Sequence, residues 1–158
     1  ALDFSLLTGT ETVLYLYCGI GTISLSLAKG AGRVIGAEIV PQAVEDAREN
    51  ARRNGITNAE FFCGDAGQVA HKLAEEGVRP QVICVDPPRK GLAPDVPAIL
   101  AGMASDRIVY VSCDPATLAR DMERFAKLGY HAVRAQGTDL FPRTRHVETI
   151  ILLSKTSE

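Results

Sequence analysis

The sequence predicts an α/β fold built on a seven-stranded, mostly parallel sheet. Short apolar runs alternate with helical patterns along all 158 residues, as they do in βαβ units. The unusual polar residues follow these runs directly, where an open α/β sheet binds its ligands. Two apolar runs joined by a loop end the chain, so we expect six parallel strands and a last strand that is antiparallel and inserted between its neighbours.

Each expected element has a local justification. Proline in a first turn favours a helix start, and Asn54-Gly55 or Gly129 favours a helix end. Apolar runs predict strands at Thr12–Tyr17, Arg33–Glu38, Ala59–Cys63, Gln81–Val85, Arg107–Val111, Tyr130–Gln136 and His146–Leu153. Helical patterns predict the end of a helix at residues 2–7 and helices from about Thr22 to Lys29, Pro41 to Asn54, Ala66 to Glu76, Pro97 to Met103 and Pro115 to Leu128.

Composition and charge exclude several classes of protein. The chain is 46% hydrophobic and 23% charged, with no run near the roughly 20 apolar residues that a membrane helix needs. A net charge of −2 is a weak electrostatic footprint for nucleic acid, so any RNA contact must be local or supplied by another part. The first residue is Ala, and we expect residues 1–158 to be one domain excised from a longer chain.

The cysteines predict a reduced, cytoplasmic protein. Cys18, Cys63, Cys84 and Cys113 are widely spaced, without a CxxC pair or a Cys/His cluster of zinc-ligand spacing. Three of them stand in apolar contexts typical of strands, so we expect neither disulfides nor a metal site.

Cys113 is the most informative residue of the chain. An apolar run delivers this thiol to a point where Pro115 opens a helix and Asp114 or Thr117 can cap it. The positive end of the helix dipole favours the reactive thiolate, so the position suits a nucleophile. The alternative is a small buried side chain at a strand end, because free cysteine is often buried.

Three loops predict a cofactor pocket. Gly19 and Gly21 let a ligand approach the backbone closely, although a lone GxG can also be only a tight turn. Glu38 ends the second strand, where a carboxylate can accept both hydroxyls of a ribose, or can be an exposed helix-capping acid. Asp65 can reach the amine of an adenine or cap the next helix. Since the loop at Cys18 offers no basic residue for a pyrophosphate, S-adenosylmethionine is favoured over a dinucleotide.

Two further loops predict a substrate site. Asp86 stands on a stiff Asp-Pro-Pro turn that suits a polar planar substrate, and Arg89 and Lys90 can meet a phosphate or form a solvated basic loop. Phe141 and Arg143, with neighbouring basic residues, suit single-stranded RNA.

Glu148 opens the otherwise apolar last strand. It is either a buried, paired carboxylate, with His146 and the nearby arginines as possible partners, or a general base.

These residues together resemble the RNA uracil-5-methyltransferases that use S-adenosylmethionine. The resemblance covers nearly the whole chain, in the family's order and spacing. The matching stretches are residues 16–22, Glu38-Ile39-Val40, Asp86-Pro87-Pro88-Arg89-Lys90-Gly91, Ser112-Cys113-Asp114-Pro115 and His146-Val147-Glu148.

The resemblance implies a Rossmann-like class I methyltransferase fold and a role for each matching residue. Cys113 would add to C6 of a uracil and Glu148 would remove the proton from C5. Asp86 would lie between cofactor and uracil, with Arg89, Lys90, Phe141 and Arg143 toward the RNA. The cofactor-binding residues would be Tyr17, Gly19, Gly21, Thr22, Glu38, Asp65 and Asp86.

The resemblance also implies partners, and it has one departure. The substrate is expected to be RNA, with 23S ribosomal RNA favoured over transfer RNA, gripped mainly by domains outside this chain; no membrane contact and a monomer are expected. Tyr15 stands where the family usually has an acidic residue, a change at the methionine end of the pocket that predicts weak cofactor binding.

Two alternatives to this function stay open. One is a nicotinamide-dependent oxidoreductase with a catalytic cysteine, against which the lack of a third loop glycine counts. The other is a non-catalytic domain that only binds a cofactor or a protein partner.

Overall fold

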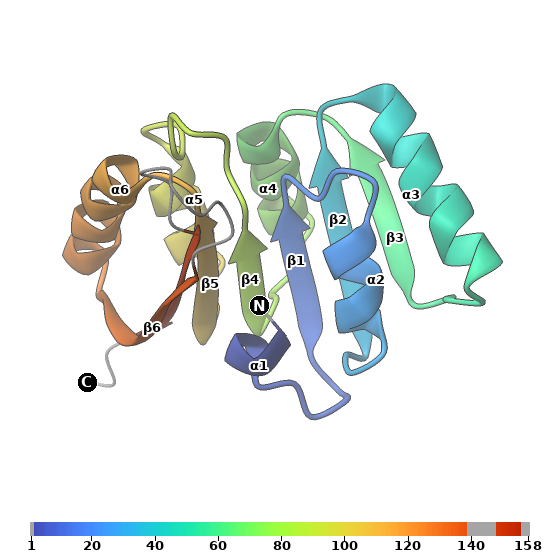
Figure 1. Cartoon of the computed structure of the whole chain (residues 1–158), viewed down its shortest axis with the longest axis horizontal. Coiled ribbons are helices and arrows are strands. Elements are labelled where there is room, and N and C mark those ends of the chain that lie inside the picture. The colour runs from blue at the N-terminus through green and yellow to red at the C-terminus, as the bar shows by residue number, and fades with distance from the viewer. Residues whose placement is uncertain (1, 139–147, 156–158) are drawn as a thin grey trace.

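The structure, a computed structural model, describes residues 2–138 and 148–155 (Figure 1). The strands are β1 Thr12–Leu16, β2 Arg33–Glu38, β3 Ala59–Cys63, β4 Val82–Val85, β5 Arg107–Ser112, β6 Tyr130–Thr138 and β7 Glu148–Lys155. The helices are α1 Leu2–Ser5, α2 Thr22–Ala28, α3 Pro41–Arg53, α4 Ala66–Glu75, α5 Val96–Gly102 and α6 Pro115–Lys127. In this part of the chain, no helix has the length and apolarity needed to cross a membrane.

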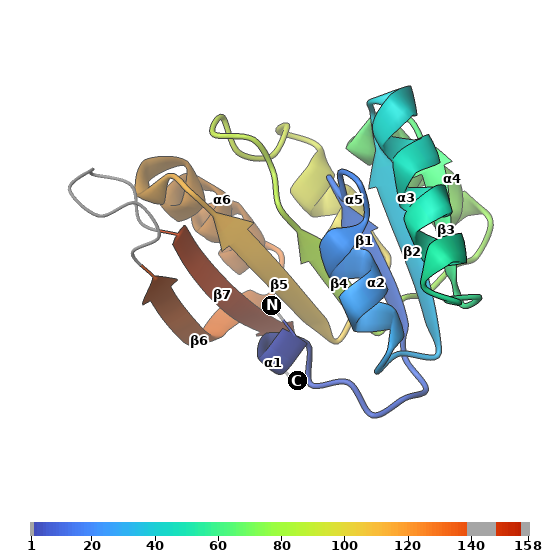
Figure 2. The same ribbon diagram turned by 45° about the vertical axis from the view of Figure 1, so that its right-hand side comes forward.

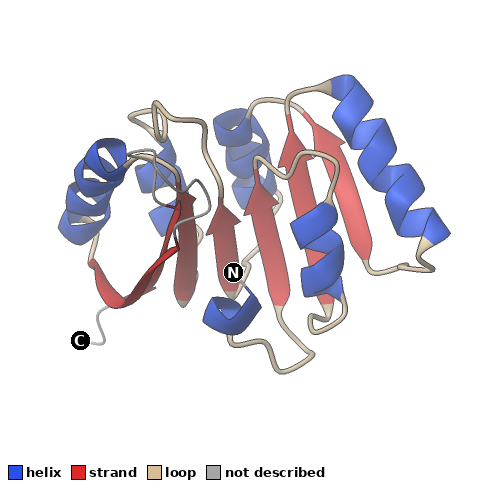
Figure 3. Cartoon of the chain, in the orientation of Figure 1, coloured by secondary structure: helices blue, strands red, loops and turns tan. Residues whose placement is uncertain are grey.

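One sheet contains all of these strands, in the order β3-β2-β1-β4-β5-β7-β6 (Figure 3). The pairs from β3 to β5 are parallel, whereas β7 pairs antiparallel with both β5 and β6. The expectation of a last antiparallel strand inserted between its neighbours is therefore confirmed. The carboxyl ends of β1 to β5 meet at the upper edge of the view in Figure 1.

Helices cover the two faces of the sheet in separate groups (Figure 2). Side chains of α1, α2 and α3 pack on one face, around Val13, Tyr15 and Val109. Side chains of α4, α5 and α6 pack on the other, around Leu14 and Ile83. Strand residues alternate between these faces. Both sides of β1 and β4 are buried, as the continuous apolar runs of parallel strands require.

The element bounds differ from the expected ones mainly at strand ends. Tyr17 was expected inside the first strand, but its φ is +64°, so β1 ends at Leu16. A left-handed residue cannot continue a strand ladder, and this backbone is uncommon for a side chain as large as tyrosine. The penultimate strand runs on to Thr138, beyond the expected Gln136, because β7 pairs along its whole length.

Candidate functional site

A pocket of about 190 Å³ lies beyond the carboxyl ends of β1 and β2. Tyr17, Glu38 and Asp65, all expected to bind the cofactor, line it together with Pro88, Lys90 and Gly91 of the loop after β4. Whole small-molecule sites usually measure roughly 300–1,000 Å³, so this hollow fits only part of a cofactor, such as a nucleoside. Burial, followed by the charges of Asp65 and other acids, raises the pKa of Tyr17 to about 12.

The loop after β1 turns on two left-handed glycines. Gly19 has a φ of +54° and nothing within 4 Å of where a Cβ would stand, so its surface is open to a ligand. Gly21 has a φ of +84°, and a Cβ there would stand 3.0 Å from the Ala47 side chain and 3.1 Å from that of Phe61. Thr22, exposed, begins α2 directly after this turn. The first glycine leaves room for a ligand, and the second fits close packing.

Glu38 holds two loops by their backbones. Its Oε2 accepts a hydrogen bond from the Gly19 N–H at 2.9 Å, and its Oε1 accepts one from the Val40 N–H at 3.0 Å. A carboxylate has about four acceptor positions, so each oxygen can still accept a ribose hydroxyl. The side chain therefore both shapes the pocket wall and presents acceptors to it.

Asp65 and Lys90 lie on the walls of the same pocket. The Oδ1 atom of Asp65 accepts from the N–H groups of Gly67 and Gln68 at 3.0 and 3.2 Å, so the residue is the N-cap of α4. This is the alternative that the sequence left open, and it leaves Oδ2 for a ligand amine. Lys90, expected to contact the substrate, also lines this pocket.

Asp86 and Glu148 lie within electrostatic reach of each other. Burial and then the charge of Glu148 raise the pKa of Asp86 to about 6. Asp86 directly follows β4, and Glu148 is the first residue of β7. Neither stands in an ion pair among the described residues. The partners expected for Glu148, His146 and the nearby arginines, lie outside the described residues.

Cys113 occupies the turn between β5 and α6. Asp114 caps α6 by accepting from the N–H groups of Ala116 and Thr117 at 2.9 and 3.0 Å, as the sequence predicts. Those hydrogen bonds, chiefly the one from Thr117, lower the pKa of Asp114, and the nearby charge of Arg89 lowers it further. Arg89 is exposed, so the loop after β4 brings a cation to this turn.

The sheet register brings Cys113 and Glu148 together. Ser112 of β5 pairs with Thr149 of β7 in the antiparallel ladder. One step further along each strand are Cys113 and Glu148, which makes them neighbours at the end of the ladder. The inserted antiparallel strand therefore brings Glu148 to the turn that carries Cys113.

Two other cysteines are held as thiols by their surroundings. Burial raises the pKa of Cys18 to about 12, with a further contribution from the charge of Glu38. Burial likewise raises the pKa of the fully buried Cys84 to about 12. Cys63 is exposed at the end of β3, whereas Cys113 is half-buried in the turn between β5 and α6. Among the four cysteines, Cys113 is thus the one that stands directly before a capped helix.

Sequence reasoning missed two residues of this region. Ile39, 62% exposed, lines the pocket next to Glu38; an apolar pair just before Pro41 could have signalled it. Asp121 is fully buried in α6 and bonded to the loop after β4. Its signal is an acid on the apolar stripe of a helix, between Leu118 and Phe125. Phe141 and Arg143 lie outside the described residues.

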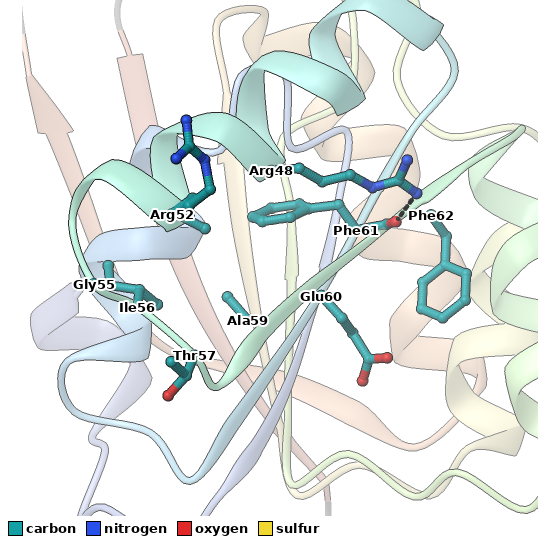
Figure 4. Close-up of a pocket in the computed structure, with 10 residues that line it drawn as sticks. Arg48, Arg52, Gly55, Ile56, Thr57, Ala59, Glu60, Phe61 and Phe62 are labelled. Carbon is teal, nitrogen blue, oxygen red and sulfur yellow. Dashed lines mark hydrogen bonds between the residues drawn. The ribbon is translucent and has the colours of Figure 1, made fainter.

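A larger concavity, about 600 Å³, lies along the outer edge of the sheet (Figure 4). Its lining comes from α3, the following turn and β3. The Arg48 guanidinium donates to the carbonyl of Phe61 at 2.8 Å, which covers part of the open edge of β3. Arginine on a sheet edge discourages pairing with another strand. We therefore assign this hollow to the protected edge of the sheet, apart from the pocket beyond β1 and β2.

The strand order, the inserted antiparallel strand and the pocket beyond β1 and β2 define the Rossmann-like fold of class I methyltransferases. Solved structures of low identity share this fold. Precorrin-6y C5,15-methyltransferase from Geobacter metallireducens superposes with a TM-score of 0.75 at 15% identity, covering 98% of this chain and 85% of that one.

Residues 5–156 match the family described as tRNA (uracil-5-)-methyltransferase, and the chain belongs to this family. An RNA methyltransferase of Lactiplantibacillus plantarum is 50% identical over 98% of this chain, and one of Clostridium acetobutylicum is 48% identical over all of it. Each alignment covers 34% of the relative, so the chain spans about a third of their length.

A solved relative shows what this fold binds elsewhere. The tRNA (uracil-54, C5)-methyltransferase of Pyrococcus abyssi, in complex with S-adenosyl-L-homocysteine, superposes with a TM-score of 0.76 at 34% identity. The match covers 96% of this chain and 36% of that one. The expected cofactor class, S-adenosylmethionine, is confirmed for the family, which argues against the nicotinamide-dependent alternative.

Proposed function

We propose that this chain is the catalytic domain of a longer protein that methylates C5 of a uridine in RNA. The observation that carries the proposal is the placement of Cys113 and Glu148 as neighbours at the end of the β5–β7 ladder, with Asp86 in reach of Glu148. A thiol and a carboxylate at one point are what addition to a pyrimidine and removal of its proton require.

The pocket after β1 and β2 fits the nucleoside part of the cofactor. Glu38 presents two carboxylate oxygens to it, Asp65 keeps one oxygen beyond its capping bonds, and Gly19 leaves open space above its backbone. These residues and Tyr17 would hold S-adenosylmethionine, which when bound supplies an electrophilic methyl group for C5. The apolar Ile39 side chain gives the nucleoside a surface to pack against.

Cys113 would begin the reaction on the uracil. Its thiolate adds to C6, forming a carbon–sulfur bond and moving the electron pair of the C5–C6 double bond toward C5 and O4. C5, a poor nucleophile in the free ring, thereby becomes an enolate carbon that can take a methyl group. The base must leave its stack to reach the thiol, and Asp86 would lie between the cofactor and the uracil.

Glu148 would end the reaction. Once C5 carries both methyl and hydrogen, the Glu148 carboxylate takes the proton, the C5–C6 double bond re-forms and the Cys113 thiolate leaves. The proton then passes from Glu148 to solvent. Glu148 is half-buried at the first position of β7, with Asp86 in electrostatic reach.

The test is methyl transfer by the full-length protein. Mass mapping of RNA from cells with and without the gene would identify the molecule, ribosomal or transfer RNA, and its uridine; our expectation from the sequence is 23S ribosomal RNA. Cys113→Ala should abolish the modification, while Cys63→Ser, which changes the exposed thiol at the end of β3, should leave it intact. If every methylated uridine remains when the gene is absent, a non-catalytic cofactor-binding domain is favoured.

A further inference from the structure

Asp121 is a fully buried carboxylate at the centre of the inner face of α6. Its Oδ2 atom accepts hydrogen bonds from the hydroxyl of Tyr110 at 2.7 Å and from the N–H of Leu92 at 2.8 Å. Its Oδ1 atom accepts from the guanidinium groups of Arg120 and Arg124 at 3.0 and 3.1 Å. A buried charge is costly unless it is paired in this way, so these four partners together offset the cost of burying Asp121.

The same two arginines hold the backbone of the loop after β4. Arg120 Nη2 donates to the carbonyl of Lys90 at 2.8 Å, and Arg124 Nη1 donates to the carbonyl of Leu92 at 3.3 Å. Gly91 lies between these carbonyls with a φ of +73°. A Cβ on Gly91 would stand 2.5 Å from Arg120 Nη2 and 2.5 Å from Asp121 Oδ2. The loop is therefore pressed against the charged cluster with no room for a side chain.

The cluster joins the two halves of the proposed site. Lys90 and Gly91 line the cofactor pocket on one side. On the other side, Tyr110 belongs to β5, three residues before Cys113, and α6 begins two residues after it. One carboxylate thus ties the pocket wall to both elements that present the thiol.

We propose that Asp121 is a positioning residue, which holds the cofactor-pocket wall in register with the turn that carries Cys113. This inference rests on the proposed function and assigns a role to a residue that touches neither cofactor nor substrate. Small displacements of reacting groups slow enzymes strongly, by up to about a hundredfold for a shift of about 1 Å. If Asp121 only stabilised α6, its substitution would lower the stability of the fold. Cofactor affinity and reaction rate would then be unchanged in the molecules that remain folded.

The experiment compares four variants of the full-length protein at a temperature where each is folded. Asp121→Asn removes the charge at the centre of the cluster. Arg120→Gln removes the link to Lys90 and one of the two ion pairs of Asp121, from a side chain that is 42% exposed. Arg124 still pairs with the buried carboxylate, so we expect this variant to fold even if Asp121→Asn does not. Glu123→Gln removes an exposed acid of the same helix, paired with Lys127, as the charge control. Phe125→Leu, in the core of the same helix face, is the stability control.

Two quantities are measured for each variant: the dissociation constant of S-adenosylhomocysteine by calorimetry, and the rate of covalent adduct formation on RNA containing 5-fluorouridine. Fluorine at C5 cannot be removed as a proton, so the methylated adduct should persist. Asp121→Asn and Arg120→Gln should each weaken binding and slow adduct formation, by about tenfold or more. Glu123→Gln should match the wild type, and Phe125→Leu should lower the melting temperature alone.

The inference is overturned if folded Arg120→Gln binds and reacts like the wild type, or if Phe125→Leu loses as much binding and rate as the cluster variants. If the wild type forms no adduct at all, the proposed uridine chemistry fails, and the binding measurements still decide whether Asp121 positions the pocket wall.

Discussion

Asp86 is the site residue whose raised pKa makes the stability of the fold depend on pH. Its pKa is raised from 3.8 to about 6 by burial and by Glu148. The folded protein therefore binds this proton more tightly than the unfolded chain, and stability falls as pH rises between these two values. We expect Asp86→Asn to raise the melting temperature at about pH 8 and the gain to vanish below about pH 4. Paired thermal scans across this range measure it; a gain independent of pH would contradict the assignment.

Glu38 is the residue on which cofactor binding should depend most. Removing its carboxylate deletes the proposed ribose acceptors and also frees the backbone of Gly19 and Val40. We expect Glu38→Ala to weaken S-adenosylhomocysteine binding by about 2 kcal/mol or more, since hydrogen bonds to charged groups contribute about 1.5–3 kcal/mol each. Glu60→Ala, which removes a surface partner of Arg33, is the matched control. Equal affinity of Glu38→Ala and wild type in calorimetry would exclude the ribose role.

At the scale of elements, the turn from β1 to α2 contains two glycines with different roles. Both Gly19 and Gly21 are left-handed, so alanine at either should cost about 1–2 kcal/mol in backbone strain. Only at Gly21 would the new Cβ also crowd Ala47 and Phe61. Gly21→Ala should therefore lower the melting temperature clearly more than Gly19→Ala, whereas Gly19→Ala should act mainly on cofactor affinity. Equal melting temperatures for the two variants would show that the packing around Gly21 can relax.

The elements themselves were largely predictable, because apolar periodicity and the proline and glycine signals are local. The inserted antiparallel strand could also be predicted, from a loop joining the last two apolar runs. The left-handed Tyr17 could not, since its side chain favours a strand and the turn overrides that preference. Nor could the role of Asp121, because its partners Leu92 and Tyr110 are 29 and 11 residues away in sequence and meet only in the fold.

At the scale of the whole molecule, charge sets what the chain can bind alone. The net charge is −2, and the basic residues proposed to meet RNA lie in short loops. RNA affinity comes mainly from neutralised phosphates and falls with salt. We therefore expect the isolated chain to bind substrate RNA much more weakly than the full-length protein in filter-binding assays at matched salt. Tight, salt-resistant binding by the chain alone would show that this chain itself makes the main RNA contacts.

The central claim is that Cys113 forms a covalent adduct with the uridine and that Glu148 resolves it. Glu148→Gln in the full-length protein tests it most directly, because an amide of the same size cannot take the C5 proton. We predict an RNA–protein band that survives denaturing gel electrophoresis, requires S-adenosylmethionine and disappears when Cys113→Ala is added. Normal turnover by Glu148→Gln, with no such band, would contradict the account and make Glu148 a structural acid.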